Sequence, residues 1–138
     1  MQPIKLINSV DEELALRGNL AAVEIRSVDI EALVDTGATM LVLPADVVER
    51  LGVRILGYRN VRYADGRRAS VPWVGGVKIV ILGRETIVTA LVEGPGTMPL
   101  IGQIPLEELD LLVDPKSREL RVNPASPDAP LLDILTAA

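Results

Sequence analysis

One acidic residue stands at the end of an apolar run and is followed by a hydroxyl and a glycine. The run is Ala32-Leu33-Val34, and the residues after it are Asp35, Thr36 and Gly37. A carboxylate at the end of a buried strand is costly to desolvate unless donors surround it or the protein uses it in chemistry. Thr36 can bond to the local backbone, and Gly37 allows a sharp turn that brings N–H groups near the carboxylate. The pattern therefore marks Asp35 as a candidate catalytic residue.

The composition narrows the chemistry that Asp35 can take part in, because the chain has no His and no Cys. This excludes His-containing triads, cysteine nucleophiles, His-ligated metals and disulfides. We expect no metal and no cofactor, so hydrolysis by this chain has to rest on carboxylates, hydroxyls or Lys. Taken alone, Asp35 could also be the cap of a local turn. A metal or phosphate site is a weaker alternative, since no phosphate loop and no cluster of acids accompanies Asp35.

Two motifs, far apart in the chain, together suggest a family. The first is Leu33-Val34-Asp35-Thr36-Gly37-Ala38, and the second is Pro99-Leu100-Ile101-Gly102, ahead of a short helix expected over 105–110. Their order and spacing resemble the two signatures of the retroviral-type (retropepsin-like) aspartic proteases. The resemblance covers residues 20–122, which we take as the core of a single domain over 1–122. It implies an all-β fold with two short helices, a half-barrel with its active site on the two-fold axis of a dimer.

The resemblance implies an aspartic endopeptidase with a carboxylate dyad. Two facing carboxylates that share one proton can act as a base towards water and as an acid towards the leaving nitrogen. Because the chain contains only one Asp-Thr-Gly, the second carboxylate is expected from Asp35 of another copy. Retroviral members commonly carry an acid and an arginine where this chain has Thr39 and Gln103. These two departures favour a cellular or bacterial branch.

Roles are carried over from the family residue by residue. Asp35 is the catalytic acid and base, Thr36 grips its counterpart across the dimer, and Gly37 bonds the substrate backbone. An extended peptide, cut between apolar residues, is the expected substrate. The residues expected to bind it are Ala38, the hairpin tip Ala64, Asp65 and Gly66, and the residues Met98, Leu100 and Ile101 of the second motif. A non-catalytic dimeric binding module is the alternative function, and the intact Asp-Thr-Gly argues against it.

The elements that must position these residues follow from the apolar pattern and the turn signals. A helix is expected from Pro44 to about Leu51, closed by Gly52. Asp65-Gly66 predicts a hairpin in the place of the family's flap, although an ordinary surface hairpin is the alternative. Residues 1–17 are expected to add one or two strands. The other strands are expected over 20–26, 28–34, 40–43, 53–63, 67–82, 86–92, 98–102, 111–114 and 120–122.

The net charge and the distribution of the basic residues indicate which classes of partner the chain can bind. A net charge of −5 and a pI near 4.7 argue against nucleic acid and anionic membranes. We find no signal peptide and no membrane span, so we expect a cytoplasmic protein. Five of the fourteen basic residues nevertheless fall in one segment, which holds Arg54, Arg59, Arg62, Arg67 and Arg68. They either keep an edge hairpin soluble or attract acidic substrate side chains.

The C-terminal residues 123–138 read as a proline-containing tail. Three prolines between residues 123 and 130 indicate a linker, and an apolar stretch follows at 131–135. This stretch could dock on the body of the domain or on a partner.

Overall fold

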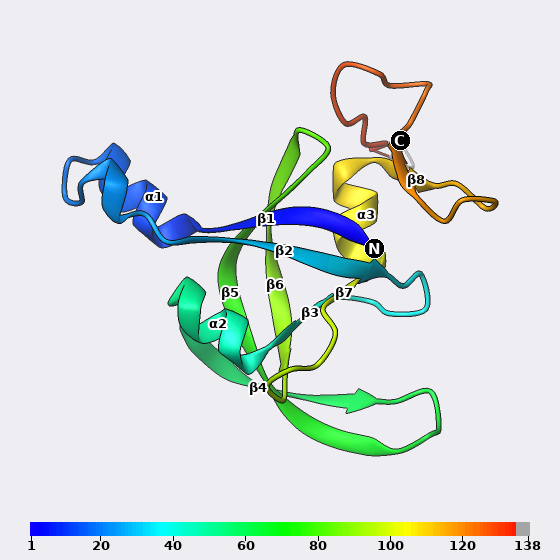
Figure 1. The fold of residues 1–138 in the computed structure, drawn as a ribbon, viewed down its shortest axis with the longest axis horizontal. Coiled ribbons are helices and arrows are strands. Elements are labelled where there is room, and N and C mark those ends of the chain that lie inside the picture. The colour runs from blue at the N-terminus through cyan, green and yellow to red at the C-terminus, as the bar shows by residue number, and fades with distance from the viewer. Residues whose placement is uncertain (135–138) are drawn as a thin grey trace.

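The computed structural model describes residues 1–134 of the chain and has mainly β structure (Figure 1). The strands are β1 (Gln2–Asn8), β2 (Ser27–Val34), β3 (Leu41–Pro44), β4 (Ile55–Arg62), β5 (Arg68–Ile81), β6 (Arg84–Glu93), β7 (Leu100–Ile101), β8 (Leu111–Val113) and β9 (Leu120–Val122). The helices are α1 (Ser9–Leu16), α2 (Ala45–Leu51) and α3 (Gln103–Leu109), with a 3₁₀ turn η1 (Ala22–Glu24). The predicted mainly β fold is confirmed, with one helix more than expected.

Seven strands form one sheet in the order β1-β2-β7-β3-β6-β5-β4, and β1 also pairs with β5. This extra pairing curls the sheet so that its inner face closes around a core. The core consists of Val, Leu, Ile and Ala side chains without any Phe, and its β-branched Val and Ile suit a pleated surface. The hairpin of β8 and β9 forms a separate two-stranded sheet, as predicted.

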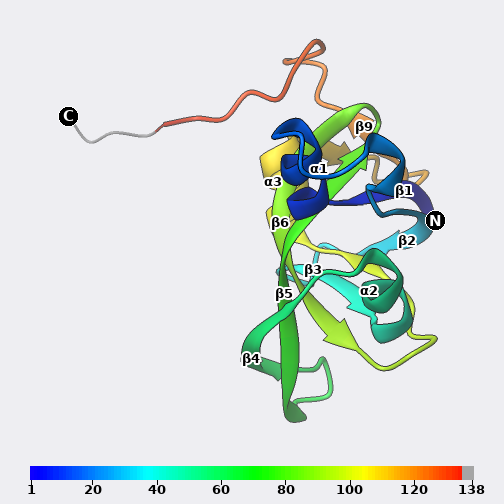
Figure 2. The same cartoon turned by 90° about the vertical axis from the view of Figure 1, so that its left-hand side faces the viewer.

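β5 is long enough to pair with three strands. Residues 68–74 pair with β4, residues 77–80 with β1, and residues 73–81 with β6. The register with β6 shifts between Val74 and Val77, where Gly76 adopts a φ of 69°. A glycine at such a shift lets the strand bend without strain. The bend lets the β4–β5 hairpin leave the body of the sheet, and Figures 1 and 2 show it projecting.

The predicted helix after the first motif is confirmed as α2. Its apolar face buries Val47, Val48 and Leu51. Gly52 ends it in the left-handed conformation with a φ of 72°, as a glycine cap requires. β3 and α2 thus follow the Asp35 loop as a firmly packed unit.

The strand predicted over 20–26 is wrong. That segment contains η1, and the antiparallel partner of β2 is β1. The chain makes an excursion between them through α1, held by Asp11, which accepts hydrogen bonds from the Arg26 backbone N–H at 3.0 Å and from its guanidinium at 2.8 and 2.9 Å. Within α1 only Asp11 is buried, so this helix has no apolar face that periodicity would reveal.

The C-terminal tail is tied to the body before it leaves it. Ser126 is buried and contacts Asp110 and Arg84. The apolar stretch is exposed as far as Ile134 and runs outward in Figure 2, while Leu135 lies outside the described residues. Over residues 1–134, no helix combines the length and the apolar character needed to cross a membrane.

Candidate active site

Asp35 follows directly on β2, and its backbone is fixed from the side by β7. These two strands run parallel, with Leu33 opposite Leu100 and Val34 opposite Ile101. The Asp35 N–H donates to the Ile101 carbonyl at 3.0 Å. A short strand from far along the chain therefore holds the Asp35 backbone in place, and the two sequence motifs are brought together as predicted.

The loop after Asp35 folds back on the carboxylate. The Gly37 N–H donates to Asp35 Oδ1 at 2.9 Å, and the Ala38 N–H donates to the Asp35 carbonyl at 3.1 Å. Asp35 and Ala38 are half-buried, while Thr36 and Gly37 are exposed. Within residues 1–134, the Asp35 carboxylate has no other hydrogen bond and no ion pair. It keeps unused lone pairs at the surface.

Gly102 packs directly against the backbone of the loop that follows Asp35. A Cβ at this position would lie 2.5 Å from the Met40 carbonyl oxygen and 2.7 Å from that of Ala38, too close for any side chain. The start of α3 then grips the same loop, since the Gln103 N–H donates to the Ala38 carbonyl and the Ile104 N–H to the Thr39 carbonyl, each at 2.9 Å. Backbone hydrogen bonds thus hold Thr39 and Gln103, the positions where the family commonly carries an ion pair.

The predicted substrate-binding residues of the second motif divide into exposed and buried ones. Met98 is 48% exposed and Leu100 is half-buried, but Ile101 is fully buried. Ile101 therefore lies under the Asp35 loop, as part of the core. Leu33 and Ile104, which were not predicted as site residues, are 45% and 40% exposed. Leu33 lies on β2 two residues before Asp35, and the Ile104 N–H donates to the Thr39 carbonyl of the Asp35 loop. The alternation of β2 gives the signal for Leu33, because the neighbouring Ala32 is fully buried on the other face.

The hairpin predicted at Asp65-Gly66 is confirmed, and its tip, Ala64 to Gly66, is exposed. No hydrogen bond or ion pair in the described chain joins this tip to the Asp35 loop. The base of the hairpin does contact the loop region, where Arg59 Nη1 lies 3.7 Å from Met40 Sδ. Nearby, the Tyr63 hydroxyl donates to Glu93 Oε1 at 2.6 Å, and this hydrogen bond raises the pKa of Tyr63.

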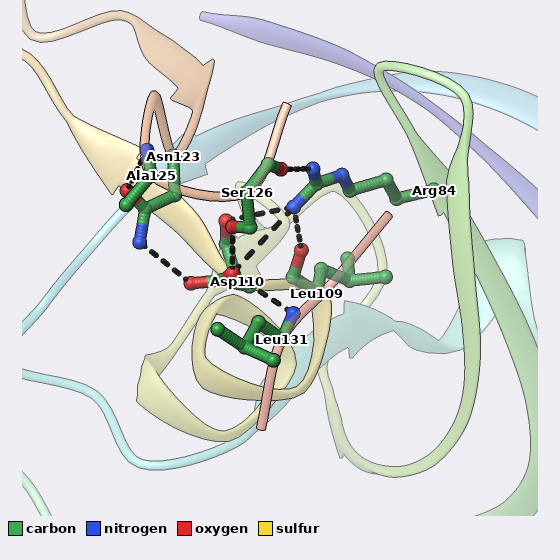
Figure 3. Close-up of polar contacts among 7 residues, drawn as sticks. All are labelled: Arg84, Leu109, Asp110, Asn123, Ala125, Ser126 and Leu131. Atoms are coloured by element: carbon green, nitrogen blue, oxygen red, sulfur yellow. Dashed lines mark hydrogen bonds and ion pairs between the residues drawn. The ribbon is translucent and has the colours of Figure 1, made fainter. Parts of the chain in front are cut away.

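A second conspicuous carboxylate, Asp110, was not predicted (Figure 3). It ends α3 in the left-handed conformation and accepts hydrogen bonds from the Ser126 hydroxyl, from Asn123 Nδ2 at 3.0 Å and from the Leu131 N–H at 3.0 Å. These donors, Ser126 foremost, lower the pKa of Asp110 to about 2. Arg84 donates to the Asp110 and Leu109 carbonyls. Fully occupied in this way, Asp110 anchors the tail.

Over residues 1–134, no group of three or more Asp and Glu residues is arranged to hold a metal ion.

Comparisons with known proteins agree with the two motifs. The model of the family described as "gag-polyprotein putative aspartyl protease" matches residues 21–114. No curated protein matches the chain. Among solved structures, EIAV protease complexed with the inhibitor HBY-793 is similar, with 23% identity and a TM-score of 0.49 over 57% of this chain and 75% of that one.

Proposed function

The chain belongs to the retroviral-type aspartic proteases, and from that premise we propose that it hydrolyses peptide bonds at a dyad of two Asp35 carboxylates, one from each copy of a homodimer. One observation carries the proposal. The Asp35 carboxylate is half-buried, accepts a single hydrogen bond from residues 1–134, and is held on a loop whose backbone is fixed by β7 and by the start of α3. Such a carboxylate is available for proton transfer, because a carboxylate with a purely structural role would have its lone pairs occupied by donors.

The chemistry follows from two such carboxylates facing each other. Like charges in close contact cannot both ionise easily, so one carboxyl keeps a proton while the other is a base. The base takes a proton from water as the water attacks the carbonyl carbon, and the acid delivers a proton to the leaving nitrogen. The Gly37 N–H already donates to Asp35, which leaves the Gly37 carbonyl to accept an N–H of the substrate. Thr36, exposed beside Asp35, is the residue that would contact its counterpart across the dimer.

Exposed apolar side chains around Asp35 support a dimer interface and an apolar substrate wall. Leu33, Met98 and Ile104 are each at least 40% exposed in the single chain, and apolar surface of this kind marks an interaction site. Part of β1 is already paired on both sides within the chain. β8 and β9 form a two-stranded sheet with open edges, so this hairpin is the segment we propose to extend the interface. Residues 1–122 form the catalytic domain in this proposal, and 123–138 its tail.

The substrate in this proposal is an extended peptide with apolar residues on both sides of the cut bond. Ala38, Met98 and Leu100 supply the wall, and the hairpin tip at Ala64, Asp65 and Gly66 covers the peptide from the other side. Backbone hydrogen bonds to an extended peptide give affinity, and side-chain pockets give specificity.

Cleavage of a peptide library tests the proposal. Pure wild-type protein and the Asp35→Asn variant are incubated with the library, and products are identified by mass spectrometry. The proposal expects cuts between apolar residues with the wild type and none with Asp35→Asn at equal dimer content. A wild-type protein that binds peptides without cutting any would favour the non-catalytic binding module instead.

A further inference from the structure

The β4–β5 hairpin carries a positive charge that the rest of the chain does not share. Residues 54–68 contain five arginines and a single acid, Asp65, in a chain whose net charge is −5. Within residues 1–134, none of these arginines lies within 4.0 Å of a carboxylate oxygen. Arginines that only keep an edge strand soluble can lie on either face of the hairpin. The face on which each arginine lies therefore decides what that arginine can bind.

The register of the hairpin sorts the arginines onto two faces. Arg62 pairs with Arg68, and Val61 pairs with Ala69. The Tyr63 N–H donates to the Arg67 carbonyl at 2.8 Å, which extends the ladder by one step. Because side chains alternate along a strand, Arg59 and Arg67 share one face, whereas Arg62 and Arg68 share the opposite face.

The face that carries Arg59 and Arg67 looks towards the catalytic loop. Arg59 Nη1 lies 3.7 Å from the sulfur of Met40, and Met40 is the last residue of the loop that begins at Asp35. On the same face, Tyr63 reaches Glu93 at the end of β6. The two arginines therefore border the space between hairpin and loop, where a peptide substrate would lie.

Both inward arginines are held by aromatic rings. The Arg59 guanidinium lies 4.4 Å from the centroid of the Trp73 ring, and that of Arg67 lies 4.3 Å from the centroid of the Tyr63 ring. Stacking uses the flat face of a guanidinium and leaves its N–H donors free along the edge. Such an edge matches a carboxylate with two parallel hydrogen bonds. The acid on this face, Glu93, is already engaged by the Tyr63 hydroxyl.

We propose that Arg59 and Arg67 form a subsite that binds acidic side chains of the substrate, so that the preferred substrates are peptides with Asp or Glu a few residues from the apolar pair that is cut. The inference rests on the proposed function, since it assigns a specificity to the same cleft. It separates Arg67 from its neighbour Arg68, which points the other way.

The experiment uses a matched pair of double variants. Arg59→Gln with Arg67→Gln removes the inward charges, and Arg62→Gln with Arg68→Gln removes the same charge from the outward face. Each is assayed on peptides with one central apolar pair, in which a single Glu or Gln is moved through the flanking positions. Dimer content and thermal unfolding are measured for both. Arg67→Gln alone provides the same comparison if the loss of Arg59 disturbs the packing on Trp73.

We expect at least one position where Glu raises the wild-type kcat/KM about five- to tenfold over Gln, the size of one charge-assisted contact at a half-exposed site. The preference should vanish in the inward variant and persist in the outward one. Equal rates for Glu and Gln peptides at every position, or an equal loss in both variants, would overturn the subsite and leave the protease intact.

Binding of the same peptides to Asp35→Asn, followed by fluorescence anisotropy, separates the two proposals. Tighter binding of a Glu peptide by Asp35→Asn, when the wild type cuts no peptide, would refute the proposed function while supporting the subsite.

Discussion

Two aspartates, Asp35 and Asp110, are placed alike and partnered differently. Each directly follows a packed element, Asp35 after β2 and Asp110 after α3. The Asp110 carboxylate accepts three hydrogen bonds, all from the C-terminal segment. The Asp35 carboxylate accepts one hydrogen bond from within the described chain, from the Gly37 N–H two residues away. The described part of the chain satisfies the Asp110 carboxylate and leaves the Asp35 carboxylate available.

The contrast separates an acid that the fold occupies from an acid that remains available for the proposed function. At Asp110 the free-energy cost of desolvating the carboxylate is offset by converging hydrogen-bond donors. These donors lower the pKa of Asp110 and fix the tail to the domain. At Asp35 the backbone is held by β7, and the loop after it by the start of α3, but within residues 1–134 no side chain donates a hydrogen bond to the carboxylate. A reaction at Asp35 requires a rigid backbone and a carboxylate whose lone pairs are unused.

The largest effect should come from exchanging the two acids for amides. Asp35→Asn should lower kcat/KM by about a thousandfold or more, because an amide cannot take the proton from water. Its unfolding temperature should change little. Asp110→Asn should behave in the opposite way, with a lowered unfolding temperature and nearly normal kcat/KM per folded dimer. Thermal unfolding and peptide cleavage on both variants check this, and matching losses of activity in the two would abolish the distinction.

Gly102→Ala tests whether the loop under Asp35 is as tightly held as the contacts indicate. The added Cβ meets backbone atoms at 2.5 to 2.7 Å, so we expect a destabilisation of about 3 kcal/mol and loss of activity. Gly94→Ala is the control, since among the described residues its Cβ would meet only Thr97 Oγ1, at 3.9 Å. Denaturant unfolding measures both. A Gly102→Ala protein as stable as Gly94→Ala would contradict the packing of the second motif beneath the loop.

A smaller effect is expected at the tail anchor. Ser126→Ala removes the hydroxyl that donates to Asp110 and should cost about 1 kcal/mol of unfolding free energy, the usual contribution of one hydrogen bond. Peptide cleavage should be unaffected, because the anchor lies away from Asp35. A loss of activity at unchanged stability would show that the two regions are coupled.

Acid should weaken the anchor gradually. The pKa of Asp110 is lowered from 3.8 to about 2, chiefly by the Ser126 hydroxyl. A carboxyl with a lowered pKa stabilises the folded state fully above 3.8, and this contribution is lost as the pH falls towards about 2. The stability advantage of wild type over Asp110→Asn should therefore be larger at about pH 5 than at about pH 2. Denaturant unfolding at both pH values measures it, and an equal advantage at both would argue against the lowered pKa.

The sequence predicts the parts of the fold that local signals decide. Asp65-Gly66 predicted the hairpin, and Gly52 predicted the end of α2. Asp114 precedes Pro115, a pair typical of turns, and its carboxylate accepts the N–H groups of Lys116 and Ser117. In each case the residues that determine the conformation are neighbours in the chain, so their spacing is visible in the sequence.

The parts that the sequence did not predict are decided by distant contacts. α1 has no apolar stripe and is held in place through Asp11 and Arg26. The role of Asp110 depends on Arg84 and on Ser126, which no motif connects to it. At the site, the sequence identified Asp35 and the second motif, but burial of Ile101 and exposure of Leu33 follow from how β7 and β2 pair.

The central claim, that one active site needs Asp35 from two copies, is tested most directly by mixing subunits. Wild-type protein is mixed with increasing amounts of Asp35→Asn, the subunits are allowed to exchange, and peptide cleavage is measured per wild-type chain. Because mixed dimers hold only one intact carboxylate, a threefold excess of the variant should reduce this activity to about one quarter. Activity per wild-type chain that stays constant at every ratio, with exchange demonstrated, would contradict the shared dyad.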